Sequence, residues 1–160
     1  MYPLRRNHRG YEFYTSKGIK YDVYFTQLIQ YSSEITSSGL DAGLFYYFGF
    51  HRNNKAPGDP DVFIKRTIAL TLFMFLTEYP KAVVVFNYSA VDGRLQARKK
   101  KFKQWFDEYA DGTNFKMFQH DFLEEYTVCA IYKRQSHPAF ETVQQNIEDL
   151  IRCLNQEQNK

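Results

Sequence analysis

The stretch Ala82-Val-Val-Val-Phe-Asn-Tyr-Ser89 decides the fold of this chain. Its β-branched and aromatic residues carry no charge, which predicts a buried strand. A strongly basic helix is expected directly after it, from Asp92. No acidic residue lies between Gly93 and Phe106, whereas the basic residues of this segment are Arg94, Arg98, Lys99, Lys100, Lys101 and Lys103. The segment that best predicts the fold is therefore followed directly by the segment with the most concentrated positive charge.

Three strands are predicted before this point. Residues 11–14 and 19–25 alternate between apolar and polar side chains and are separated by a turn at residues 16–18, which is typical of a hairpin. Residues 44–50 are hydrophobic on both faces and predict a central strand. Gly49 within this strand marks a bulge or a close approach of another group.

The remaining elements follow from caps and periodicity. Asp59 with Pro60 predicts the start of a buried helix, which Pro80 ends. Two strands are expected at 115–122 and 126–132, followed by a helix from residue 136. That last helix has an apolar stripe made of Phe140, Val143, Ile147, Leu150, Ile151 and Leu154. The order β-β-β-α-β-α-β-β-α predicts an α+β fold, with a mostly antiparallel sheet of about six strands and three main helices.

Composition narrows the possible classes of protein. The chain has 160 residues, which suits a single domain, and we expect it at residues 11–156 behind a flexible basic arm at residues 1–10. Its two cysteines, Cys129 and Cys153, form no disulfide framework, and we expect reduced, buried thiols. No pair of histidines has metal-ligand spacing, so we predict no metal site. No segment is long and apolar enough for a membrane span, and a cytoplasmic location is expected.

Two resemblances add to this interpretation. The residues Tyr11, Phe13, Gly18, Tyr21 and Val23, the stretch from Tyr47 to Phe50, Thr67-Ile68 and the helix with Arg94, Arg98, Phe102 and Phe106 resemble a bacterial family of unknown function. The order of elements also resembles the core of the GNAT-type acetyltransferase superfamily. That resemblance implies that acetyl-CoA or another acyl-CoA enters where two central strands separate.

The acetyltransferase resemblance also assigns residues. It implies that a backbone N–H beside Gly49 polarises the thioester and that the loop from Arg52 to Gly58 surrounds the pyrophosphate. His51, at the end of a central strand, is either a general base that deprotonates an amine or a surface histidine beside a loop. The residues implied in holding the cofactor are Gly49, Arg52, Lys55 and Gly58. Arg94 and Arg98 are added to this set because they begin the basic helix beside the end of a central strand, a common position for a ligand. Phe102 stands where the superfamily often has a tyrosine, and a phenyl ring has no proton to donate to the departing thiolate. The resemblance therefore leaves two alternatives, an N-acyltransferase and a non-catalytic relative.

The basic helix and the aromatic residues allow other interpretations. The basic residues form either a solvated helix face or a face that binds phosphate groups. A nucleic-acid-associated module, such as a component of a defence or toxin system, would use Lys99, Lys100, Lys101 and Lys103. A protein-interaction domain or a homodimer would use exposed aromatic side chains, since 18% of the residues are aromatic.

Overall fold

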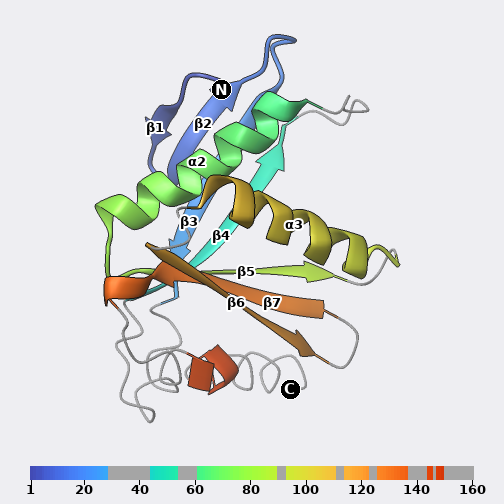
Figure 1. The fold of residues 1–160 in the computed structure, drawn as a ribbon. Coiled ribbons are helices and arrows are strands. Elements are labelled where there is room, and N and C mark those ends of the chain that lie inside the picture. Colours follow the sequence, from blue (N-terminus) through green and yellow to red (C-terminus); the bar gives the residue numbers. More distant parts are fainter. Residues whose placement is uncertain are drawn as a thin grey trace, which may run out of the picture.

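A seven-stranded mixed sheet carries two helices side by side on one face (Figure 1). The computed structural model describes residues 1–28, 44–53, 61–89, 93–110, 114–122, 126–136, 144–145 and 147–149. The strand order is β1-β2-β3-β4-β5-β7-β6. The predicted α+β class is confirmed, and the prediction of about six strands is corrected to seven.

The first half of the sheet is antiparallel. It consists of β1 (Arg5–Asn7), β2 (Gly10–Tyr14), β3 (Lys20–Gln27) and β4 (Phe45–Arg52). The predicted hairpin is confirmed, and Gly18 supplies the left-handed backbone of its turn with a φ of 71°. The segment expected to be a flexible arm instead contains β1, which pairs with β2 from Arg5 to Asn7. The backbone groups of β1 that face β2 are paired in the sheet, a contact that composition alone does not signal.

The second half of the sheet begins with a crossover. Helix α2 (Val62–Glu78) leads from β4 to β5 (Val83–Ser89), which pairs in parallel with β4. Helix α3 (Leu95–Tyr109) follows. The hairpin of β6 (Phe115–Phe122) and β7 (Tyr126–Lys133) then places β7 beside β5, and the short 3-10 helix η4 (Arg134–Ser136) comes after it.

Apolar side chains form a core on each face of the sheet. The core beneath α2 and α3 includes Val23, Phe48, Val84 and Ile131. The core on the opposite face consists of Leu28, Phe45, Val83, Val85, Val128, Ala130, Tyr132 and Ile147. Ile147 is fully buried there, as its predicted stripe requires, and the other residues of that stripe lie outside the described residues. The central strands are therefore covered on both faces, as their continuous hydrophobic sequences indicate.

Both helix starts differ from the sequence prediction. Asp61, not Asp59, caps α2, because its side chain accepts a hydrogen bond of 2.8 Å from the Phe63 N–H. Helix α3 begins at Leu95 after Arg94, which makes no side-chain cap, so the helix starts later than predicted from Asp92. The backbone at Gly93 has a φ of 68°, a left-handed conformation that separates this helix from the chain before it.

Candidate functional site

The parallel strands β4 and β5 separate before they end. Their pairing covers only three positions, from Phe45 opposite Val83 to Tyr47 opposite Val85. Beyond these positions the two strands run in diverging directions (Figure 1). A cleft with a volume of about 360 Å³ opens between them. Clefts of this size are typical of small-molecule sites.

The side of this cleft that faces the helices is mostly aromatic. Its residues come from β4, β5 and α3, and they are Phe48, Phe50, Phe86, Tyr88, Phe102 and Arg98. Phe86 lies 5.7 Å from Phe48 and 5.4 Å from Phe102, measured between ring centroids. Phe102 also stacks on Tyr88 at 5.0 Å. Among the described residues, Arg98 is the one charged residue on this mostly aromatic side of the cleft.

The opposite side of the cleft is polar. It is formed by Tyr24, Tyr47, Gly49 and Asn87. The Tyr47 hydroxyl donates a hydrogen bond of 2.9 Å to Asn87 Oδ1 and so spans the gap between the separating strands. Desolvation is the main cause that raises the pKa of Tyr47, and the nearby Tyr24 adds to it. The Tyr47 hydroxyl therefore stays protonated at neutral pH and can serve as a donor.

Gly49 lies at the centre of the cleft, but without a bulge. The register between β3 and β4 continues unbroken, with Tyr24 directly opposite Gly49. A Cβ atom on Gly49 would lie 2.2 Å from the hydroxyl oxygen of Tyr24. The sequence offered a bulge or a close approach. The predicted bulge is wrong for the pairing of β4 with β3. The predicted close approach is confirmed, and the group that approaches Gly49 is the ring of Tyr24.

The other predicted cofactor-binding residues are only partly brought together. Arg98 lines the cleft with Gly49, whereas Arg94 is exposed before the first turn of α3 and does not line it. Arg52 ends β4, four positions after Phe48. Lys55 and Gly58 lie outside the described residues.

His51 lies beside the cleft rather than in it. It is exposed, and its ring centroid is 6.2 Å from that of Tyr24. Its Nε2 atom is 3.6 Å from Asp22 Oδ2, because Asp22 is its register partner on β3. Asp22 also accepts a hydrogen bond of 2.9 Å from Asn53. The carboxylate is thus held in place next to an imidazole, an arrangement that can orient a general base.

The basic residues of α3 are in part neutralised. Lys99 forms an ion pair of 2.7 Å with Asp121, and Lys103 forms one of 2.9 Å with Asp107. The hydrogen bond from Lys99 is the main cause that lowers the pKa of Asp121. Lys101 lies over the ring of Trp105, and Lys100 is exposed. The net charge available to a nucleic acid is therefore smaller than the sequence suggests.

Cys129 is buried, as predicted. Burial raises the pKa of its thiol to about 12, so a thiolate does not form at neutral pH. Gln119 donates a hydrogen bond of 2.8 Å to the neighbouring Tyr88 hydroxyl. The Tyr88 side chain thus points toward Gln119 on β6, and the residue is buried in the core. Cys153 lies outside the described residues.

Sequence reasoning missed most of the cleft. Tyr24, Tyr47 and Asn87 were not singled out as site residues, and only Asn87 left a signal, as an amide within an apolar strand. Tyr24 is 25 positions before Gly49 and reaches it only through the β3–β4 register. Within the described ranges, no group of three potential metal ligands lies together, and no helix is long and apolar enough to cross a membrane.

Comparisons with known proteins identify a family. A search of the curated proteins gives no match. Residues 60–149 match the profile described as a family of unknown function, DUF6169. The matched range is more than half of the chain and runs from the start of α2 through β7 to the helical residues 147–149. The chain therefore belongs to the DUF6169 family, and the predicted membership of a family of unknown function is confirmed.

Proposed function

We propose that this protein is a cytoplasmic, GNAT-like domain that binds an acyl-CoA in the cleft between β4 and β5. The observation that carries the proposal is the separation of two central parallel strands after three paired positions, around a cleft of about 360 Å³. Beyond the point of separation, the inward backbone groups of β4 and β5 do not pair with each other in the described part of the chain. An extended ligand with amide groups, such as the pantetheine arm of CoA, can pair with them.

Charge and polarity divide the roles along the cleft. Arg98, which lines the cleft, and Arg52, which ends β4, would hold phosphate groups through charge-assisted hydrogen bonds, together with Lys55, three positions further along the chain. A backbone N–H next to Gly49 would polarise the thioester carbonyl. His51, oriented by Asp22 at 3.6 Å, would take a proton from an acceptor amine on the polar side.

The protein is either an N-acyltransferase or a non-catalytic relative. Phe102 lines the cleft but has no proton for the departing thiolate. An enzyme would release free CoA thiol when acetyl-CoA is mixed with amines, and His51→Gln would lose this activity. A non-catalytic relative would bind CoA and release none.

The test of binding is isothermal titration calorimetry with CoA and acetyl-CoA. We expect binding by the wild type and a Kd about tenfold or more weaker for Arg98→Ala, because a charged hydrogen bond contributes roughly 1.5–3 kcal/mol. Lys100→Ala is the matched control on the same helix, exposed and outside the cleft. Absence of binding at millimolar CoA, or equal Kd values for all three proteins, would refute the proposal.

Nucleic-acid binding is the second candidate function. The exposed Lys100 and Lys101 on α3 favour it. If it holds, charge reversal at Lys99, Lys100 and Lys101 abolishes oligonucleotide binding, and binding by the wild type weakens steeply with salt. Unchanged binding by the reversed variant would count against this function.

A protein-interaction function rests on exposed apolar side chains. Val62, Phe63 and Met74 on α2 are 61%, 49% and 41% exposed. Such residues would suit a partner protein or a homodimer. Light scattering tests the homodimer directly, and a monomer mass at high concentration would exclude it.

A further inference from the structure

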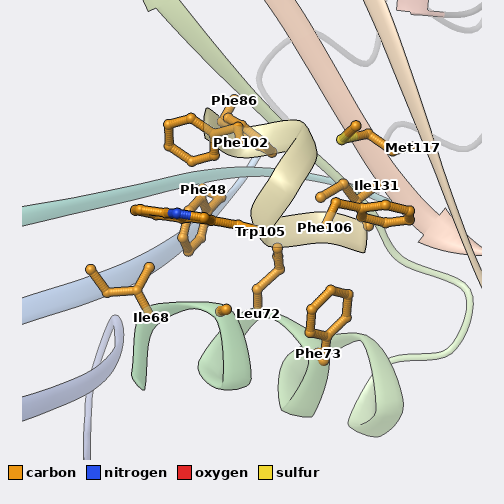
Figure 2. Close-up of a pocket in the computed structure, with 11 residues that line it drawn as sticks. Phe48, Ile68, Leu72, Phe73, Phe86, Phe102, Trp105, Phe106, Met117 and Ile131 are labelled. Carbon is orange, nitrogen blue, oxygen red and sulfur yellow. The ribbon is translucent and has the colours of Figure 1, made fainter. Parts of the chain in front are cut away.

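A second, inner cavity lies behind the aromatic wall of the cleft. It lies between α2, α3 and the sheet (Figure 2) and has a volume of about 30 Å³. Its lining has no charged side chain and no hydroxyl group and includes Ile68, Ala69, Leu72, Trp105 and Met117. A water molecule would find few hydrogen-bond partners in such a space, which therefore favours an apolar occupant.

The inner cavity and the cleft share a wall. Phe48, Phe86 and Phe102 line both of them. Their ring centroids are 5.7 Å apart for Phe48 and Phe86 and 5.4 Å apart for Phe86 and Phe102, so the three rings pack side by side. Because these rings line both spaces, they form a wall of rings between them. In Figure 2 these rings and the Trp105 indole lie together on one side of α3. Phe102 is only partly buried, so its ring is the one most able to move.

We propose that the natural ligand carries an acyl group longer than acetyl, whose alkyl end passes the ring wall and occupies the inner cavity. This inference rests on the proposed binding of an acyl-CoA. An acetyl group ends one carbon beyond the thioester carbonyl and cannot cross a layer of rings. A volume of about 30 Å³ takes roughly one methyl or methylene group, so the chain ends soon after it enters. The structure thus assigns short to medium alkyl chains rather than acetyl or long fatty acyl groups.

Chain length is the variable that tests this assignment. The probes are CoA and acetyl-, butyryl-, hexanoyl- and octanoyl-CoA, titrated into the wild-type protein by calorimetry. Burial of each methylene tightens Kd about fourfold, so we expect one of the longer chains to bind at least about tenfold more tightly than acetyl-CoA. Equal Kd values across the series would overturn the inference and leave the proposed function intact. Failure of CoA and all its thioesters to bind would instead overturn the proposed function.

A cavity-filling variant locates the chain. Ala69 lines the inner cavity but not the cleft. We expect Ala69→Leu to bind acetyl-CoA within about twofold of the wild type and to lose the gain from longer chains. Ala97→Leu, the same change at an exposed position of α3, should keep that gain. A full gain in Ala69→Leu would refute the inner cavity as the site of the chain. If Ala69→Leu does not fold, the comparison of Kd values across chain lengths in the wild-type protein still tests the inference.

Tryptophan fluorescence gives a second readout. Trp105 is the only tryptophan of the chain, and its ring centroid is 5.0 Å from that of Phe102. A chain that displaces Phe102 and enters the inner cavity changes the surroundings of the indole. We expect a spectral shift with hexanoyl-CoA that acetyl-CoA does not produce. The same spectrum with both ligands would contradict the inference.

Discussion

Replacement of Gly49 by alanine tests how the centre of the cleft is built. Gly49 is not among the described glycines with a positive φ, so its backbone conformation suits any residue. The added Cβ would, however, lie 2.2 Å from both Cζ and the hydroxyl oxygen of Tyr24 and 2.6 Å from its Cε2. These contacts are far shorter than van der Waals distances, so the Tyr24 ring must move. The steric cost of the substitution therefore comes from Tyr24.

The magnitude follows from two opposing effects. Displacement of the half-buried Tyr24 ring is an overpacking cost of about 1–3 kcal/mol. Alanine in place of a strand glycine lowers the entropy of the unfolded chain and recovers roughly 0.5–1 kcal/mol. We expect Gly49→Ala to lower the free energy of unfolding by about 1–2 kcal/mol. In a Tyr24→Ala background only the favourable effect remains, so the same change should stabilise the protein by about 0.5–1 kcal/mol.

Urea denaturation of the four proteins of this double-mutant cycle is the assay. The predicted result is a change of sign, with Gly49→Ala destabilising the wild type and stabilising Tyr24→Ala. The corresponding coupling energy is about 2 kcal/mol, within the range measured for residues in contact. Equal effects of Gly49→Ala in both backgrounds, or stabilisation of the wild type, would refute the reasoning.

Three further predictions concern stability. Burial raises the pKa of Cys129 from 9.0 to about 12, so the unfolded chain releases a proton that the folded chain keeps, and stability falls as pH rises from 9 to 12. Cys129→Ala should show a shallower decline, by up to about 1.4 kcal/mol per pH unit in denaturation curves, and identical slopes would contradict this. Asp61→Ala should lower the urea midpoint, because Asp61 caps α2 and accepts a hydrogen bond from Tyr2. Asp61→Asn should lower the midpoint less, and equal losses would argue against capping. Lys65→Met should cost about 0.5–1 kcal/mol by breaking the bond to Glu108 that joins α2 to α3, and an unchanged urea midpoint would argue against this link.

Periodicity was sufficient to predict most of the sheet. Alternation located β2 and β3, and continuous apolar residues identified β4 and β5 as central strands with a core on each face. The side chains of β7 alternate between the two faces of the sheet, with Cys129 and Ile131 in one core and Val128 and Ala130 in the other. These signals are local, since they depend only on which face a side chain takes along one strand.

Features that depend on partners distant in sequence were missed or misplaced. Strand β1 exists because Arg5–Asn7 pair with β2, and its basic composition resembles that of a free arm. The cap of α2 was predicted at Asp59 and is found at Asp61. Both residues have a carboxylate that can cap a helix, and the hydrogen bond from Tyr2 favours Asp61. The sequence alone does not show which of two equivalent residues caps a helix when a contact with a distant residue determines it.

The candidate site shows the same division. Gly49 and Arg98 were predicted as ligand-binding residues, and the structure places both at one cleft. The cleft itself forms where β4 and β5 stop pairing. The residues of these two strands carry no pattern that predicts where their pairing ends. Its polar side depends on the Tyr47–Asn87 hydrogen bond, which joins residues 40 positions apart.

The central claim is that CoA binds between β4 and β5. It is tested most directly by NMR, through the backbone amide resonances of ¹⁵N-labelled protein during titration with CoA. The account predicts that the largest shift changes occur at residues 48–50 of β4, 86–88 of β5 and 98–102 of α3. Absence of changes at saturating CoA, or changes confined to amides outside the cleft, would contradict it.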